Sequence, residues 1–93
     1  MYELTISDVR KVMLQYVQEN DCCMVSEAML YGISDENLAK SSFKDLGFDS
    51  MDTADIILRI ELEYDLNVYD DDYFQRLISA QSIKEFLRIL KLL

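Results

Sequence analysis

The chain has 93 residues, with 18 acidic and nine basic side chains, a formal net charge of −9 and no histidine. This length predicts a single domain over residues 1–93, which can bury about 60–65% of the surface that its unfolded chain exposes. Nucleic acid and anionic membrane surfaces are excluded as partners, because both bind clustered Lys and Arg; a basic protein surface suits the charge better, although the charge could also serve solubility alone.

The two cysteines, Cys22 and Cys23, are adjacent in the sequence. Neighbouring cysteines seldom form a disulfide, because the bridge strains the intervening peptide. The pair fits neither a disulfide framework nor a zinc site, so we expect reduced thiols, no metal and a cytoplasmic protein. No signal-peptide pattern appears and no apolar run approaches about 18 residues, so no membrane insertion is expected.

The first apolar pattern predicts a helix that starts after Thr5 and runs to about Glu19. Thr5 and Asp8 form a weak capping box at its start. Its apolar stripe is most simply core and consists of Ile6, Val9, Val12, Met13, Tyr16 and Val17. Residues 20–33 follow without such a pattern, although Ser26 could cap a short helix that stops at Gly32.

The stretch from Phe43 to Asp52 joins a polar segment to the strongest helical pattern of the chain. Gly47 allows a backbone conformation that other residues reach only with strain, and Asp49 or Ser50 can cap the helix that follows. The Ser50 hydroxyl is then exposed at a helix N-terminus, where the dipole and free N–H groups favour an attached phosphate by about 0.3–1 kcal/mol. An ordinary capping serine would give the same local motif.

The second long helix is predicted from about Ser50 to Tyr64, and it has two apolar faces. One face groups Thr53, Ile56, Ile57, Ile60 and Tyr64. The opposite face groups Met51, Leu58 and Leu62, with Asp55 among them. A helix in a small bundle buries one stripe, so the second face is either covered by residues 20–33 or exposed as a contact site.

A short third helix is predicted after a loop over residues 65–69. Asp70, Asp71 and Asp72 open it, where their negative charge suits the helix dipole. It carries Tyr73, Phe74, Leu77 and Ile78. A calcium loop starting at Asp65 is excluded, because its sixth position is not glycine and its twelfth is not glutamate.

The last helix is predicted to start with a capping box of Ser82 and Glu85. Its apolar stripe consists of Ile83, Phe86, Leu87, Leu90 and Leu93. Three longer helices, one short helix and no alternating strand pattern predict an all-α four-helix bundle with a long first connection.

The stretch Leu46-Gly47-Phe48-Asp49-Ser50-Met51-Asp52 resembles the Asp-Ser-Leu motif of the acyl carrier protein family, the phosphopantetheine-binding carrier domains. The likeness extends from Leu38 to Leu90. It implies a 4′-phosphopantetheine arm, derived from coenzyme A and esterified to Ser50 beside Asp49, whose thiol carries acyl groups as thioesters. Met51 replaces the usual Leu, which conserves volume.

The resemblance also bears on the long first connection. Residues 20–33 exceed the family's usual length, so we interpret them as an insertion. Ser34 to Leu38 resembles the polar turn and apolar anchor that precede the motif, and Leu38, Phe43 and Leu46 would hold this connection to the core.

In the second and third helices, the resemblance suggests two further groups of residues. Partner enzymes would contact Met51, Asp52, Asp55, Leu58, Glu61 and Leu62. An acyl chain would lie beside Ile57 and Ile60, with Leu77 or Ile78, although these residues could also be plain core. The expected partners are a phosphopantetheinyl transferase, and acyl-transferring and condensing enzymes with basic docking surfaces; we expect a monomer.

Three alternatives bear on this interpretation. A catalytic role for Ser50 is excluded, because a hydrolase serine needs a base and the chain has no histidine; the second glycine of the nucleophile elbow is also missing. A small acidic helical adaptor without a prosthetic group, and a carrier for amino acid loading, both stay open. The sequence does not decide between fatty acid and polyketide-like synthesis.

Overall fold

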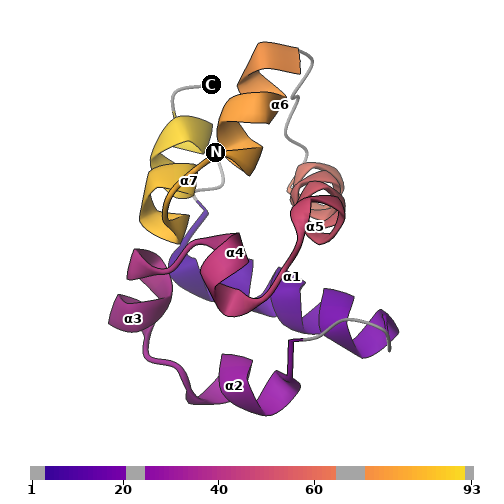
Figure 1. The fold of residues 1–93 in the computed structure, drawn as a ribbon, viewed down its shortest axis with the longest axis vertical. Coiled ribbons are helices and arrows are strands. Elements are labelled where there is room, and N and C mark those ends of the chain that lie inside the picture. Colours follow the sequence, from indigo (N-terminus) through magenta and orange to yellow (C-terminus); the bar gives the residue numbers. More distant parts are fainter. Residues whose placement is uncertain (1–3, 21–24, 65–70, 92–93) are drawn as a thin grey trace.

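The structure is a computed structural model that describes residues 4–20, 25–64 and 71–91. The described residues form seven helices and no strand, so the all-α prediction is confirmed. The helices are α1 (Ile6–Glu19), α2 (Glu27–Gly32), α3 (Asp35–Lys40), α4 (Phe43–Leu46), α5 (Ser50–Glu63), α6 (Asp71–Ile78) and α7 (Ile83–Lys91). Four of them, α1, α5, α6 and α7, are the helices that the sequence predicts, and Figure 1 shows them arranged as a helical bundle.

Helix α1 contacts helices from both halves of the chain. It packs against α2, α3 and α5, and in Figure 1 it crosses the middle of the molecule with α2 below it and α6 above it. The predicted capping box is present, with Thr5 and Asp8 exchanging side chain–backbone hydrogen bonds. Val9, Val12 and Met13 are completely buried, which confirms the predicted core stripe.

Three short helices, α2, α3 and α4, lie within the first connection. Each begins after a serine whose hydroxyl accepts a hydrogen bond from the backbone N–H three residues later. The cap at Ser26 was predicted. The polar turn expected from Ser34 to Leu38 was wrong, because Ser34 caps the helix α3 instead. The apolar anchors Leu38, Phe43 and Leu46 are buried as expected.

A single arginine of α1 holds α2 and α3 in place. The guanidinium of Arg10 donates hydrogen bonds to the carbonyl oxygens of Leu30 and Ile33, at 2.5 and 2.7 Å, and pairs with the Asp35 carboxylate at 2.6 Å. These carbonyls lie near the C-terminal end of α2, where a cation is favourable. The second half of the predicted insertion is therefore fixed to α1.

The C-terminal helices complete the core. Helix α6 packs against α5, and α7 packs against both α3 and α6. The backbone N–H of Ile83 donates to the carbonyl of Ser41 at 2.7 Å, which joins the start of α7 to the end of α3. The ring of Phe86 meets that of Phe43 edge-on at 5.2 Å between centroids.

The predicted capping box of α7 is only half present. The Ser82 hydroxyl accepts from the N–H of Glu85 at 3.0 Å, but the Glu85 carboxylate accepts from the N–H of Gln81. The carboxylate thus closes the turn one residue earlier than a true box does. The expectations for Cys22, Cys23, the loop over residues 65–69, Asp70 and Leu93 lie outside the described residues, as do the side chains of Asp71 and Tyr73.

Candidate functional site

A glycine turn determines where α5 begins. The short helix α4 ends at Gly47, whose φ of 110° is in the left-handed region. A Cβ at this position would also lie 3.2 Å from Cγ2 of Val25. The N–H groups of Gly47 and Phe48 donate to the carbonyls of Lys44 and Phe43, both at 3.0 Å. The predicted need for glycine at this turn is confirmed.

Asp49, not Ser50, caps α5. The Asp49 carboxylate accepts from the N–H of Asp52 at 2.8 Å, and the Asp52 carboxylate accepts from the N–H of Asp49 at 3.2 Å. The Thr53 hydroxyl adds a bond to the Asp49 carbonyl at 2.8 Å. This reciprocal box leaves Ser50 as the first residue of the helix, with an exposed side chain that takes no part in the capping.

The backbone around Ser50 can bind an anion. Among the described residues, the N–H groups of Ser50 and Met51 have no hydrogen-bond acceptor. Both lie in the first turn of a 14-residue helix, where the positive end of the dipole adds to their attraction. A phosphate esterified to the Ser50 hydroxyl therefore fits this position.

The first turn of α5 is also tied to α1, which the sequence did not reveal. The Tyr16 hydroxyl donates to Oδ1 of Asp52 at 2.5 Å. The Tyr16 ring, 4% exposed, meets the Phe48 ring edge-on at 6.1 Å between centroids. Periodicity assigned Tyr16 to the core stripe, but no local pattern links its hydroxyl to a carboxylate 36 positions later.

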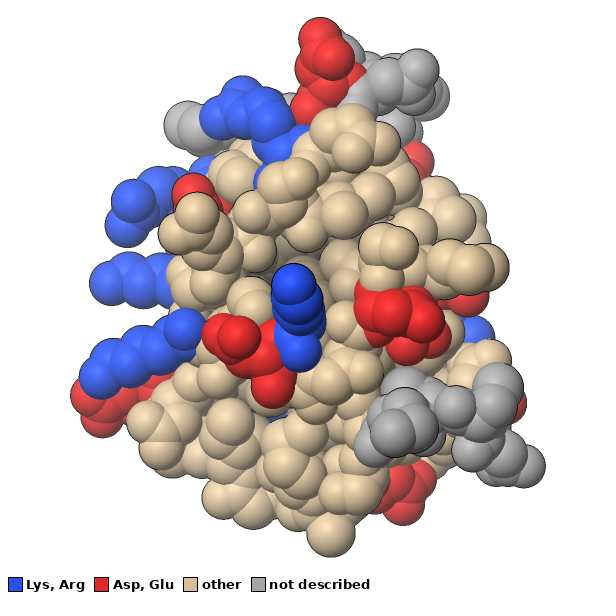
Figure 2. Space-filling model, viewed as in Figure 1, with Lys and Arg blue, Asp and Glu red and all other residues tan. Residues whose placement is uncertain are grey.

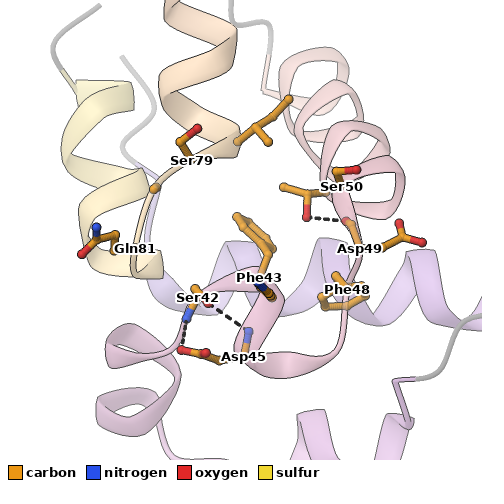
Figure 3. Close-up of a pocket in the computed structure, with 12 residues that line it drawn as sticks. Ser42, Phe43, Asp45, Phe48, Asp49, Ser50, Ser79 and Gln81 are labelled. Carbon is orange, nitrogen blue, oxygen red and sulfur yellow. Dashed lines mark hydrogen bonds between the residues drawn. The ribbon is translucent and has the colours of Figure 1, made fainter.

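A hollow of about 600 Å³ opens beside Ser50. In Figure 3, Ser79 and Gln81 lie on one side of it, Ser50 and Asp49 on the other, and Phe43 between them. Its lining includes exposed polar residues, such as Ser79 and Gln81, and buried apolar ones, such as Phe43 and Phe48. The residues that line it are Ser42, Phe43, Lys44, Asp45, Phe48, Asp49, Ser50, Thr53, Ile78, Ser79, Ala80 and Gln81.

Of the four residues predicted for an acyl cavity, only Ile78 lines this hollow. Ile57, Ile60 and Leu77 do not border it; they are at most 1% exposed and belong to the packed core. The sequence missed Ser42, Ser79 and Gln81, because polar residues at helix ends show no periodic pattern that distinguishes a lining residue from a turn residue.

The outer face of α5 is open, so the described residues 25–33 of the predicted insertion do not cover it. Met51, Leu58 and Leu62 are 80%, 47% and 84% exposed, and Asp55 is exposed beside them. Glu61 is partly buried, and so is Asp52, whose carboxylate is already bonded to Tyr16 and to the Asp49 N–H. The apolar side chains therefore dominate this surface.

Charge is distributed unevenly around the site. Helix α5 contains four acidic side chains and one basic one, whereas α7 contains three basic side chains and one acidic one. Figure 2 shows the basic side chains gathered along the edge of the molecule that carries α3 and α7. The negative charge of the described site therefore lies on α5 rather than on α7.

Two classes of feature are not found in the described part of the chain. It contains no group of three or more acidic, His or Cys side chains arranged to hold a metal ion. None of its helices combines the length and the apolar character that crossing a membrane requires.

Comparison with known proteins points to one family. Residues 28–87 match a family model described as a phosphopantetheine attachment site. Acyl carrier protein 1, chloroplastic, from Spinacia oleracea is 33% identical over 69 residues, which cover 74% of this chain and 49% of the spinach protein. The chain thus spans about half the length of that curated relative. No solved structure gives a significant match.

Proposed function

The chain belongs to the acyl carrier protein family, whose domain is the attachment site of a covalent 4′-phosphopantetheine arm, and we propose that Ser50 is the residue that carries the arm. The thiol of the bound arm supplies the chemistry, since it holds acyl groups as thioesters for biosynthetic enzymes. One observation carries the proposal: Ser50 is exposed and is the first residue of α5. It also lies within residues 28–87, which match the family model.

The surroundings of Ser50 support this assignment. The phosphate would accept hydrogen bonds from the N–H groups of Ser50 and Met51. The dipole of α5 would stabilise its negative charge by about 0.3–1 kcal/mol. Asp49 keeps the helix start closed by capping, so the hydroxyl of Ser50 stays free for transfer. Among the described residues, no histidine or metal site stands near Ser50 that would suggest a catalytic use instead.

The hollow beside Ser50 is suited to shelter the arm and the first part of its cargo. A volume of about 600 Å³ lies within the range of small-molecule sites. Phe43, Phe48 and Ile78 offer apolar contact, and Ser79 and Gln81 offer hydrogen bonds. A longer acyl chain would reach Ile57, Ile60 and Leu77 only where α5 and α6 move apart, because these residues are fully packed.

Partner enzymes would approach the outer face of α5. The phosphopantetheinyl transferase and the acyl-transferring and condensing enzymes need access to Ser50, and Met51, Leu58 and Leu62 are the exposed apolar residues of the same helix. Asp55 and the other acids of residues 49–72 would attract basic docking surfaces. Fatty acid or polyketide-like synthesis is the pathway that we propose, and the similarity to a plant acyl carrier protein supports it.

The test is intact-mass spectrometry after incubation with coenzyme A, magnesium and a broad-specificity phosphopantetheinyl transferase. We expect the wild-type chain to gain one phosphopantetheine, and Ser50→Ala to gain none. Ser50→Ala is a clean control, because the Ser50 side chain takes no part in the capping of α5. An unmodified wild-type chain would instead support the acidic adaptor without a prosthetic group.

A second experiment tests which class of group the chain carries. The loaded chain is incubated separately with an acyl-acyl carrier ligase and with an amino-acid-activating enzyme, and thioester formation is followed by mass. Acylation by the first enzyme alone is the expected result, and aminoacylation alone would identify a carrier for amino acid loading.

A further inference from the structure

We propose that Tyr16 is a positioning residue for the modification of Ser50, an inference that rests on the proposed function. Tyr16 lies on α1 and does not line the hollow beside Ser50. It acts through Asp52, whose carboxylate is shared between the capping of α5 and the tyrosine hydroxyl.

The two oxygens of the Asp52 carboxylate have different partners. Oδ2 accepts from the N–H of Asp49 at 3.2 Å, which closes the capping box, and Oδ1 accepts from the Tyr16 hydroxyl at 2.5 Å. A carboxylate held at both oxygens cannot rotate without losing a bond. The Tyr16 hydroxyl therefore holds the Asp52 carboxylate in place. That carboxylate in turn holds the N–H of Asp49, the residue directly before Ser50.

Tyr16 is itself held on three sides. Its ring is 4% exposed and packs edge-on against Phe48, the residue before the Asp49 cap. The guanidinium carbon of Arg59 lies 5.3 Å from the ring centroid, and that guanidinium pairs with Glu19 at 2.5 Å. The hydroxyl is thus held by the first turn of α5, and the ring by the turn before α5 and by the middle of α5.

This arrangement gives the exposed Ser50 a rigid support. Ser50 projects from the first turn of a helix, a place that frays when its cap is loose. Transfer of the arm requires the hydroxyl to be held in line with the phosphate of coenzyme A, and small displacements at such a position are costly. Loss of the Tyr16 hydroxyl would leave the docking surface on α5 unchanged but loosen the attacking group.

The chain offers a matched control at the other end of the same helix pair. The Tyr64 hydroxyl, at the C-terminal end of α5, donates to Oδ1 of Asp8 on α1 at 3.4 Å. Tyr16→Phe and Tyr64→Phe each remove one hydroxyl that joins α1 to α5. Only the first of these hydroxyls touches the cap that precedes Ser50.

The experiment measures steady-state transfer of phosphopantetheine to wild type, Tyr16→Phe and Tyr64→Phe, well below their melting temperatures. We expect Tyr16→Phe to lower kcat about fivefold with KM within about twofold of wild type, since positioning rather than docking is lost. Tyr64→Phe should keep both constants. An unchanged kcat in Tyr16→Phe, or an equal fall in Tyr64→Phe, overturns the inference.

A second variant keeps the test decisive if Tyr16→Phe does not fold. Asp52→Ala removes both acceptor oxygens, so it breaks the bond to the Tyr16 hydroxyl and the bond to the Asp49 N–H, and it should lower kcat. An unchanged kcat in Asp52→Ala overturns the inference. A wild-type chain that takes no arm overturns the proposed function and this inference with it, whereas a modified wild type with unaffected variants overturns the inference alone.

Discussion

The two faces of α5 carry the same kinds of apolar side chain, but one face is buried and the other is exposed. On the inner face, Ile56, Ile57 and Ile60 are at most 1% exposed, packed between α1 and α6. On the outer face, Leu58 and Leu62 are 47% and 84% exposed. Residue type alone therefore does not separate buried from exposed positions in this helix. Position around the helix does, because a small bundle covers only one side of it.

A substitution on the inner face of α5 should have the largest effect on stability. Ile57→Ala should lower the free energy of unfolding by about 2–5 kcal/mol, because it removes buried methyl groups and leaves a cavity among packed neighbours. Denaturant unfolding monitored by circular dichroism measures this loss. A loss below about 1 kcal/mol would mean that the inner face is not tightly packed.

Charge on the outer face should affect association rather than folding. Asp55→Lys should lower kcat/KM for the transferase severalfold, about 3–10-fold at low salt, because an exposed carboxylate that attracts a basic partner becomes a repelling cation. The difference from wild type should shrink as sodium chloride is added. An equal rate at low salt would remove Asp55 from the partner surface.

Asp55 tests this charge effect more cleanly than Asp52 does. The Asp52 carboxylate holds the Asp49 N–H and the Tyr16 hydroxyl, so Asp52→Lys would break the start of α5 in addition to changing the charge. The sequence groups the two acids together, and the structure separates a structural acid from an exposed one.

The smallest effect on stability is expected at Leu58. Leu58→Ala should cost less than about 1 kcal/mol, because a side chain that is half exposed leaves no enclosed cavity when it is shortened. Thermal melts of this variant beside Ile57→Ala compare the two faces at neighbouring positions. Equal destabilisation of the two variants would show that the outer face is covered.

The sequence predicted the parts of the molecule that depend on local chemistry. The capping residues Thr5 and Ser26 and the glycine turn at Gly47 act within a few positions of the chain, and all three are confirmed; of the two caps that the sequence allowed for α5, Asp49 and Ser50, the structure has Asp49. Helical periodicity likewise separated the two faces of α5, because it depends only on the spacing of side chains.

The features that the sequence missed depend on contacts between distant segments. The bond from Tyr16 to Asp52 and the lining of the hollow by Ser79 and Gln81 join elements far apart in the chain. The helix α3 was missed for another reason: Ser34 to Leu38 is polar and short, and the helix is stabilised by its serine cap, by the Arg10–Asp35 pair and by its packing on α1 and α7.

The most direct test of the division between the two faces is the KM of Leu58→Ala as a substrate of the phosphopantetheinyl transferase. The account predicts a KM at least about threefold higher than that of wild type, with kcat retained, because an apolar contact made on docking is lost while Ser50 and its support stay in place. An unchanged KM would contradict the account, because the transferase would then dock somewhere other than the outer face of α5.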